Sequence, residues 1–183
     1  MLIDASKAFL LIIDMQERLV PAVAGTQEIL RRSAILLKAA KAIGIPVVLS
    51  EQYPKGLGHT VAAIREEAGN APAFEKTAFS CWRDEEFKKH LIGHYEGGRP
   101  QAIVAGVEAH VCVLQTAIDM AQAGFAVYAV ADAMSSRAAS SVELAHHRMR
   151  QAGVSVINSE MAVFELLGKA GTAEFKALSA LVR

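Results

Sequence analysis

The chain has 183 residues, 52% of them hydrophobic, and its 19 lysines and arginines balance its 19 aspartates and glutamates. A net charge of zero gives no support for nucleic-acid binding or for a charged interaction tail. The length fits one compact domain over residues 1–183, long enough to bury a substantial core. The apolar surplus indicates a sheet buried on both faces, self-association into a homo-oligomer, or both.

The sequence shows no sign of membrane insertion or secretion. No apolar stretch approaches the roughly 20 residues that a membrane-spanning helix needs. Residues 1–7 lack the basic segment, apolar run and cleavage site of a signal peptide. Two cysteines without CxxC spacing fit a reducing compartment. We therefore predict a cytoplasmic protein that makes no contact with membranes.

Short apolar runs alternate with helical patterns along the chain. Strands are predicted at residues 8–13, 46–50, 71–75, 103–105, 125–130 and 154–157. Helices are predicted at residues 27–43, 60–68, 84–92, 110–123, 140–151, 159–167 and 172–181. This alternation predicts a three-layer α/β fold, in which a doubly wound, six-stranded parallel sheet carries helices on both faces.

Three reactive side chains follow strands of this predicted sheet. Asp14 comes directly after the first strand, Lys76 after the third, and Cys112 after the fourth, across a short elbow. Ligands of open parallel sheets bind beyond the carboxyl ends of the strands. An acid, an ammonium and a thiol at that edge together predict nucleophilic catalysis by the cysteine. Alone, each has a simpler explanation, as a turn former, a solvated charge or a core side chain.

Charge suggests the role of each group. Asp14 takes the thiol proton and later activates water, whereas Lys76 holds Asp14 and, as a cation, lowers the pKa of Cys112. The backbone N–H groups of Glu108 and Cys112, at the start of the following helix, are predicted to form an oxyanion hole. If the third strand lies two positions from the first, about 10 Å away, the loop carrying Lys76 must fold inward.

Five further side chains are candidates for the substrate pocket. Tyr53, Phe79 and Trp82 lie on loops at the same predicted edge, where aromatic residues commonly line small-molecule sites. Their alternative role is to pack the loops or to contact another subunit. Gln16 either binds substrate or shapes the turn after the first strand. His110 is a candidate substrate contact, but two residues from the cysteine it points elsewhere and is not expected to be the base.

No cofactor and no metal are expected, and a small-molecule substrate is the expected ligand. Gly56-x-Gly58 is not followed by a helix-starting phosphate motif, so a dinucleotide site is not predicted. His90 and His94 have i, i+4 spacing, but neither an acidic ligand nor a third histidine accompanies them.

Four stretches of the sequence resemble the isochorismatase-like cysteine hydrolases, a family that includes nicotinamidases and related amidases. They are Leu10–Gln16, Lys76–Ser80, Gly106–Val113 and Asp132–Arg137. The resemblance implies a six-stranded parallel sheet and a catalytic triad of the aspartate, lysine and cysteine named above. It also implies a cis peptide bond in the elbow, between Val107 and Glu108.

The chain departs from the nicotinamidase branch of that family. In that branch an Asp-x-His pair after the second strand, with a further histidine, binds a divalent metal that holds the pyridine ring. The equivalent stretch, residues 50–58, contains no histidine pair, although His59 lies just beyond it. The sequence therefore resembles a branch without the metal motif, and nicotinamidase activity is not expected.

We predict a cysteine hydrolase that cleaves a small amide or related acyl substrate through a thioester intermediate. A retained Cys112 favours acyl transfer, because the isochorismatase branch often has another residue there. Two alternatives stay open: a non-catalytic oligomeric scaffold or binding protein of the same fold, and an isochorismate-type vinyl-ether hydrolase. An ionised Cys112, which reacts with iodoacetamide below the ordinary cysteine pKa of about 8.5, would distinguish the hydrolase from the scaffold.

Overall fold

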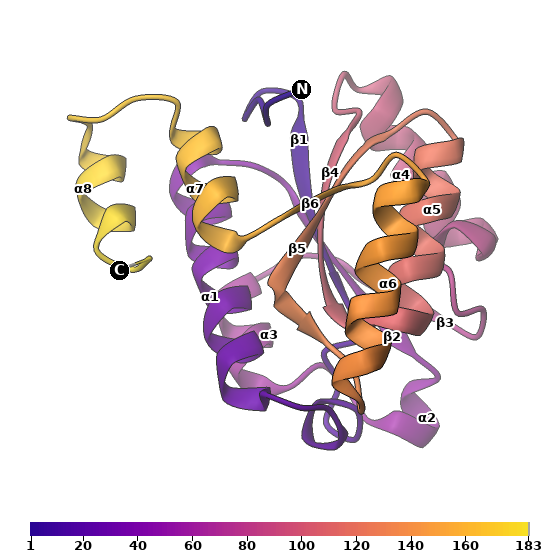
Figure 1. The fold of residues 1–183 in the computed structure, drawn as a ribbon. Helices are drawn as coiled ribbons and strands as arrows, with labels where there is room; N and C mark the ends of the chain where they lie inside the picture. Colours follow the sequence, from indigo (N-terminus) through magenta and orange to yellow (C-terminus); the bar gives the residue numbers. More distant parts are fainter. Residues whose placement is uncertain (183) are drawn as a thin grey trace.

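The computed structural model describes residues 1–182, which form a six-stranded parallel sheet with helices on both faces (Figure 1). The strands are β1 (Ala8–Ile13), β2 (Val47–Gln52), β3 (Ala73–Lys76), β4 (Gln101–Val107), β5 (Ala126–Ser135) and β6 (Ser155–Ile157). Their order is β3-β2-β1-β4-β5-β6, and each neighbouring pair is parallel. The predicted fold class is confirmed. The order reverses between β1 and β4, so a ligand site is expected at the carboxyl ends of these two strands.

The helices form two layers. They are α1 (Thr26–Ile43), α2 (Pro54–Leu57), α3 (Ala62–Ala68), α4 (Glu85–Glu96), α5 (Leu114–Gln122), α6 (Ala139–Gln151), α7 (Ser159–Leu167) and α8 (Ala173–Ser179). Figure 1 shows α1, α3, α7 and α8 on one side of the sheet and α4, α5 and α6 on the other. In residues 1–182 no helix is both long and apolar enough to cross a membrane.

The central strand β1 shows why the sheet is covered on both faces. Every residue of Ala8–Ile13 is at most 1% exposed. Leu10 and Ile12 pack into the core beneath α1, α3 and α7, whereas Phe9 and Leu11 pack into the core beneath α4, α5 and α6. Each fully buried large side chain stabilises the fold by about 1.5–3 kcal/mol, so a continuous apolar run is what this position requires.

Four strands extend further at their carboxyl ends than the hydrophobic pattern predicts, β3 by one residue, β2 and β4 by two, and β5 by five. Strand β2 continues past Ser50 to Gln52, and β5 continues past Val130 to Ser135. The added residues include polar side chains with specific bonds: the Asp132 carboxylate accepts hydrogen bonds of 2.7 Å from the backbone N–H and the hydroxyl of Ser159 at the start of α7. Hydrophobic patterning therefore ends where the sheet edge becomes polar, short of the true strand end.

Candidate active site

Asp14 leaves the end of β1 in a left-handed backbone conformation, with φ 50°. Non-glycine residues seldom adopt this conformation, and aspartate tolerates it better than most. The chain after β2 secures this turn: the Val61 N–H donates to the Met15 carbonyl at 2.8 Å, and the Glu17 N–H donates to the His59 carbonyl at 3.0 Å. The residue that follows β1 is thus fixed by a segment more than 40 positions away.

The carboxylate of Asp14 is buried, and each of its oxygens accepts a hydrogen bond. Its Oδ1 accepts from the Ser50 hydroxyl at 2.6 Å, and its Oδ2 accepts from the Lys76 ammonium at 2.8 Å. Both side chains of the Asp14–Lys76 pair are 0% exposed. A buried ion pair is stable only when its remaining polar atoms also have partners, and here they do.

Lys76 is the last residue of β3, rather than part of an inward-folding loop as the sequence suggested. Its side chain extends past the end of β2 to reach Asp14. Burial lowers the pKa of Lys76, but the negative charge of Asp14 and its hydrogen bond to the ammonium raise it, and the net shift is above the ordinary value. Lys76 is therefore an ammonium.

Gln52, the last residue of β2, connects the ion pair to the thiol. Its Oε1 accepts a hydrogen bond of 2.7 Å from the Lys76 ammonium and lies 3.9 Å from the Cys112 sulfur. Its Nε2 donates to the Thr77 carbonyl at 2.8 Å. Sequence reasoning missed Gln52. The available signal was its position: a polar residue at the carboxyl end of a strand next to the switch point.

Cys112 lies in a π-helical turn, Ala109–Val113, which joins β4 to α5. The residue is 5% exposed. Burial raises the pKa of the Cys112 thiol, and the Asp14 carboxylate raises it further, whereas Lys76 lowers it by less. The predicted lowering of the Cys112 pKa is therefore wrong, because burial and the nearby anion outweigh the single cation. At neutral pH the sulfur carries its proton.

The elbow before Cys112 depends on a close approach between β4 and β1. Gly106 has φ 125°, and a Cβ at this position would overlap the backbone of Ile13. The following peptide bond, between Val107 and Glu108, is cis, at the place the family resemblance implies. The Glu108 carboxylate accepts from the Arg137 backbone N–H at 3.1 Å and from its Nε at 3.0 Å, which ties the elbow to the end of β5.

Two predicted pocket residues have other roles. Gln16 is buried; its Nε2 donates to the carbonyls of Gln52 and Gly58, and its Oε1 accepts from the Gln52 N–H at 2.7 Å. It shapes the turn and has no polar atom left for substrate. The ring of Trp82 packs edge-on against Phe125, with centroids 5.7 Å apart, beside the start of β5. Both pocket assignments are corrected: Trp82 faces the amino end of the sheet because its loop turns back over α5.

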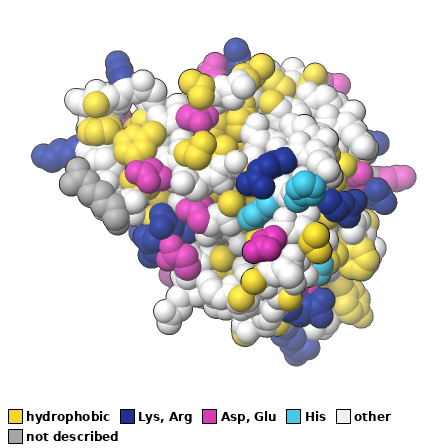
Figure 2. Space-filling view, in the orientation of Figure 1, with side chains coloured by type: hydrophobic (Ala, Val, Ile, Leu, Met, Phe, Trp, Pro, Cys, Tyr) yellow, Lys and Arg dark blue, Asp and Glu magenta, His cyan; other side chains and the backbone are white. Residues whose placement is uncertain are grey.

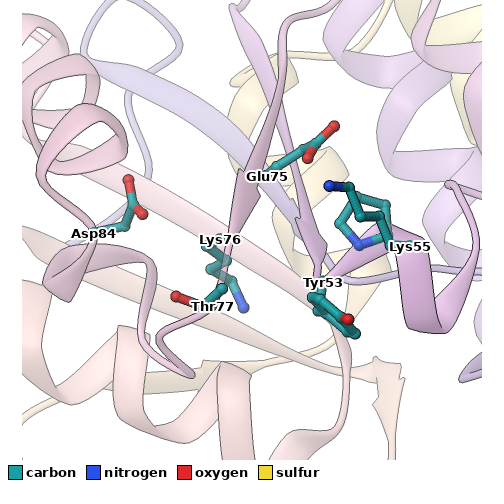
Figure 3. Close-up of a pocket in the computed structure, with 7 residues that line it drawn as sticks. Tyr53, Lys55, Glu75, Lys76, Thr77 and Asp84 are labelled. Atoms are coloured by element: carbon teal, nitrogen blue, oxygen red, sulfur yellow. The ribbon is translucent and has the colours of Figure 1, made fainter.

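The remaining pocket candidates lie at the carboxyl edge. Tyr53 and Phe79 are each 55% exposed. Tyr53 lines a hollow of about 350 Å³ together with Pro54, Lys55, Glu75, Lys76, Thr77 and Asp84 (Figure 3). His110 places its Nδ1 2.9 Å from the Ser136 hydroxyl, next to the elbow. Cys112 is not among the residues that line this hollow, so the hollow borders the triad from the Lys76 side.

The segment where the nicotinamidase branch binds metal is organised around a carboxylate. Glu51 accepts hydrogen bonds of 2.7 Å from both the backbone N–H and the hydroxyl of Thr60, and its Oε2 lies 2.9 Å from Nδ1 of His59. Within residues 1–182, no three His, Cys, Asp or Glu side chains gather in a way that would hold a metal ion.

The second cysteine, Cys81, lies near the same charged pair, and both Lys76 and Asp14 influence its pKa. Cys81 is completely buried, and its backbone N–H donates to the Thr116 hydroxyl at 2.9 Å. Burial raises the pKa of Cys81 to about 11. It packs in the core on the α4–α6 side of the sheet.

The fold and this arrangement define an α/β protein of the doubly wound class, with its candidate active site at the switch point between β1 and β4. The family model for the isochorismatase domain matches residues 8–161, and the chain belongs to this family.

Known relatives resemble this chain over most of its length. Isochorismatase domain-containing protein 1 of Salmo salar is 38% identical over 170 residues, which are 93% of this chain and 59% of that protein. The chain thus spans less than two thirds of that relative's length. The structure of MAR1 ribonuclease from Caenorhabditis elegans is 36% identical, with a TM-score of 0.91, and the match covers 100% of this chain and 92% of that one. The YcaC gene product of Escherichia coli, an octameric hydrolase of unknown specificity, is 25% identical, with a TM-score of 0.91 and coverages of 98% and 90%.

Proposed function

We propose that this protein is a cysteine hydrolase that cleaves a small amide or related acyl substrate through a thioester on Cys112. The observation that carries the proposal is the buried Asp14–Lys76 pair, with atoms 2.8 Å apart, beside the thiol of the elbow. A buried ion pair costs desolvation free energy and is often no more stabilising than apolar packing. The position of the pair beside the Cys112 thiol is explained if the pair takes part in catalysis by that thiol.

The first half-reaction transfers the acyl group to sulfur. Because the pKa of Cys112 is raised, the proton moves to Asp14 as the sulfur attacks the carbonyl carbon, and not before. The backbone N–H groups of Glu108 and Cys112 are proposed to bind the oxyanion that forms. Asp14 then protonates the leaving nitrogen, the C–N bond breaks, and the amine departs.

The second half-reaction returns the enzyme to its starting state. Asp14 removes a proton from water, the hydroxide attacks the thioester carbonyl, and the C–S bond breaks. The sulfur regains its proton from Asp14, and the carboxylic acid leaves. Lys76 stays an ammonium throughout, since its pKa is raised, and it compensates the charge that moves between Asp14 and the substrate.

The surroundings of the site favour a small substrate. The hollow beside Lys76, about 350 Å³, lies at the lower end of the range of about 300–1,000 Å³ found for small-ligand pockets. Its wall combines the Tyr53 ring with charged side chains of both signs, among them Lys55 and Asp84 (Figure 3). We propose that this hollow admits the part of the substrate that leaves as the amine.

We also propose that the chain forms a homo-oligomer. The YcaC gene product, which shares the fold, is an octamer. Leu2, Met161 and Phe164 border a hollow near α7 and are exposed, and Figure 2 shows apolar side chains at the surface on that side of the molecule. Exposed apolar side chains gathered in one place are typical of protein interfaces.

Parallel alanine substitutions of the two cysteines test the proposed nucleophile. Both residues are buried, so Cys112→Ala and Cys81→Ala leave similarly small voids. On a panel of primary amides, with enol ethers and an RNA oligonucleotide as alternative substrates, we expect Cys112→Ala to lose at least about a thousandfold in kcat. Cys81→Ala should keep most of its activity. Full amide turnover by Cys112→Ala would refute covalent catalysis at this residue.

A further inference from the structure

Gln52 contacts two members of the proposed triad, Lys76 and Cys112, and is connected to the third through Lys76. Its Oε1 is 2.7 Å from the Lys76 ammonium and 3.9 Å from the Cys112 sulfur, the range of a weak S–H donor. The Lys76 ammonium that it contacts also bonds Asp14 at 2.8 Å. We propose that Gln52 is a positioning residue, whose carboxamide oxygen fixes the Lys76 ammonium and the protonated Cys112 in one arrangement with Asp14; this inference rests on the proposed function.

The orientation of the Gln52 carboxamide is determined by its neighbours. Its Nε2 donates to the Thr77 carbonyl at 2.8 Å, so the oxygen must face Lys76. A flipped amide would set its NH₂ group against an ammonium and lose both hydrogen bonds. The backbone of Gln52 is also fixed, because Gln16 bonds its N–H at 2.7 Å and its carbonyl at 3.0 Å.

A neutral acceptor suits this position better than a charged one. A carboxylate in place of the amide would be a second anion beside Asp14 and would compete with it for the thiol proton. The amide oxygen accepts a hydrogen bond from the thiol but is too weak a base to take its proton. Gln52 thereby leaves Asp14 as the only base in contact with the sulfur while it supplies the second acceptor that Lys76 needs.

This role has an unusual consequence for the thiol. A hydrogen bond to the neutral form of an acid disfavours its ionisation, so the Gln52 oxygen stabilises the protonated sulfur. Removal of the oxygen should therefore make Cys112 ionise more readily. The same removal leaves Lys76 without one of its two acceptors, which should slow turnover. A residue that only filled space would not shift these two properties in opposite directions.

The variant Gln52→Met removes both polar atoms and nearly preserves the volume of the side chain. We expect its Cys112 to react with iodoacetamide about 3–10-fold faster at pH 8 than in the unchanged protein, read from the labelled Cys112 peptide. For the best amide substrate we expect kcat to fall about 10–100-fold, with KM within about threefold. Gln101→Met is the matched control: Gln101 is also buried and hydrogen-bonded, but it begins β4 at the opposite edge of the sheet.

The charged variant Gln52→Glu extends the test and has nearly the same shape. We expect alkylation of Cys112 to slow at least tenfold at pH 8, because a second carboxylate opposes formation of the thiolate. An alkylation rate in Gln52→Met equal to or below that of the Gln101→Met control would overturn the proposed role, and so would an unchanged kcat. Thermal unfolding verifies that each variant is folded.

The alkylation assay needs no substrate, which separates this inference from the proposed function. If Cys112→Ala retains full turnover, the hydrolase proposal fails whatever the Gln52 variants do. If Cys112→Ala is inactive while the Gln52→Met thiol behaves like the control, only the role of Gln52 fails.

Discussion

Two regions of this protein remove titratable side chains from solvent, but only one of them gives these side chains hydrogen-bond partners. At the carboxyl edge of the sheet, Asp14 and Lys76 are 0% exposed, yet each has hydrogen-bond partners. On α4, the Nε2 atoms of His90 and His94 are buried without a partner. Their rings pack against Phe74 and Phe9, with centroids 4.7 and 4.5 Å apart.

The two regions differ in whether their titratable side chains stay charged in the folded protein. At the carboxyl edge, the negative charge of Asp14 helps keep the pKa of Lys76 raised in spite of burial. On α4, burial above all, together with the neighbouring His90 and Arg99, lowers the pKa of His94 to about 4. These half-buried histidines therefore act as neutral, aromatic-like packing residues. Partners, and not burial alone, distinguish a chemical site from packing.

The largest expected effect is a loss of folding stability when the close contact between β4 and β1 at the carboxyl edge is disturbed. We predict that Gly106→Ala destabilises the fold by more than about 3 kcal/mol, because the new Cβ would overlap the Ile13 backbone and the residue has φ 125°. The comparison variant is Gly93→Ala on α4, where a Cβ meets nothing within 4 Å. It should be neutral or stabilising by up to about 1 kcal/mol.

Urea unfolding of both variants gives the two free energies directly. If the unfolding free energy of Gly106→Ala lies within 1 kcal/mol of that of the unchanged protein, the close contact between β4 and β1 does not exclude a Cβ, contrary to this prediction.

A smaller effect concerns the pH dependence that the α4 histidines confer. The folded-state pKa of His94 is about 4, below its unfolded value of about 6.5, so the unfolded chain binds more protons between these pH values. The stabilisation that neutral His94 gives to the folded state is present above pH 6.5 and is lost as the pH falls toward 4. Since His94 is only partly buried, we expect this loss of unfolding free energy to be about 1–2 kcal/mol.

The variant His94→Phe, which keeps the stacking on Phe9, isolates this contribution. The fall in the unfolding free energy between pH 7 and pH 5 should be smaller in His94→Phe by about 1 kcal/mol. Equal falls in both proteins would mean that His94 is free to take up a proton in the folded state.

Sequence reasoning located the edge but not its chemistry. Asp14, Lys76 and Cys112 were placed together because strand–helix alternation fixes a parallel topology, whose strand ends share one edge. The protonation of Cys112 was mispredicted because sequence order reveals neighbours but not burial. Gln52 was missed because a polar strand end looks like a loop. Trp82 was misplaced because the direction of a loop depends on packing, here against Phe125.

In the proposed mechanism, Cys112 carries the acyl group during turnover. The most direct measurement is mass spectrometry of the protein quenched in acid during hydrolysis of a primary amide. Cys81 and Cys112 fall on different tryptic peptides, so each reports separately. We predict a mass increase equal to the acyl group on the Cys112 peptide and none on the Cys81 peptide. Steady amide turnover with an unmodified Cys112, or with the acyl group on Cys81, would rule out Cys112 as the nucleophile.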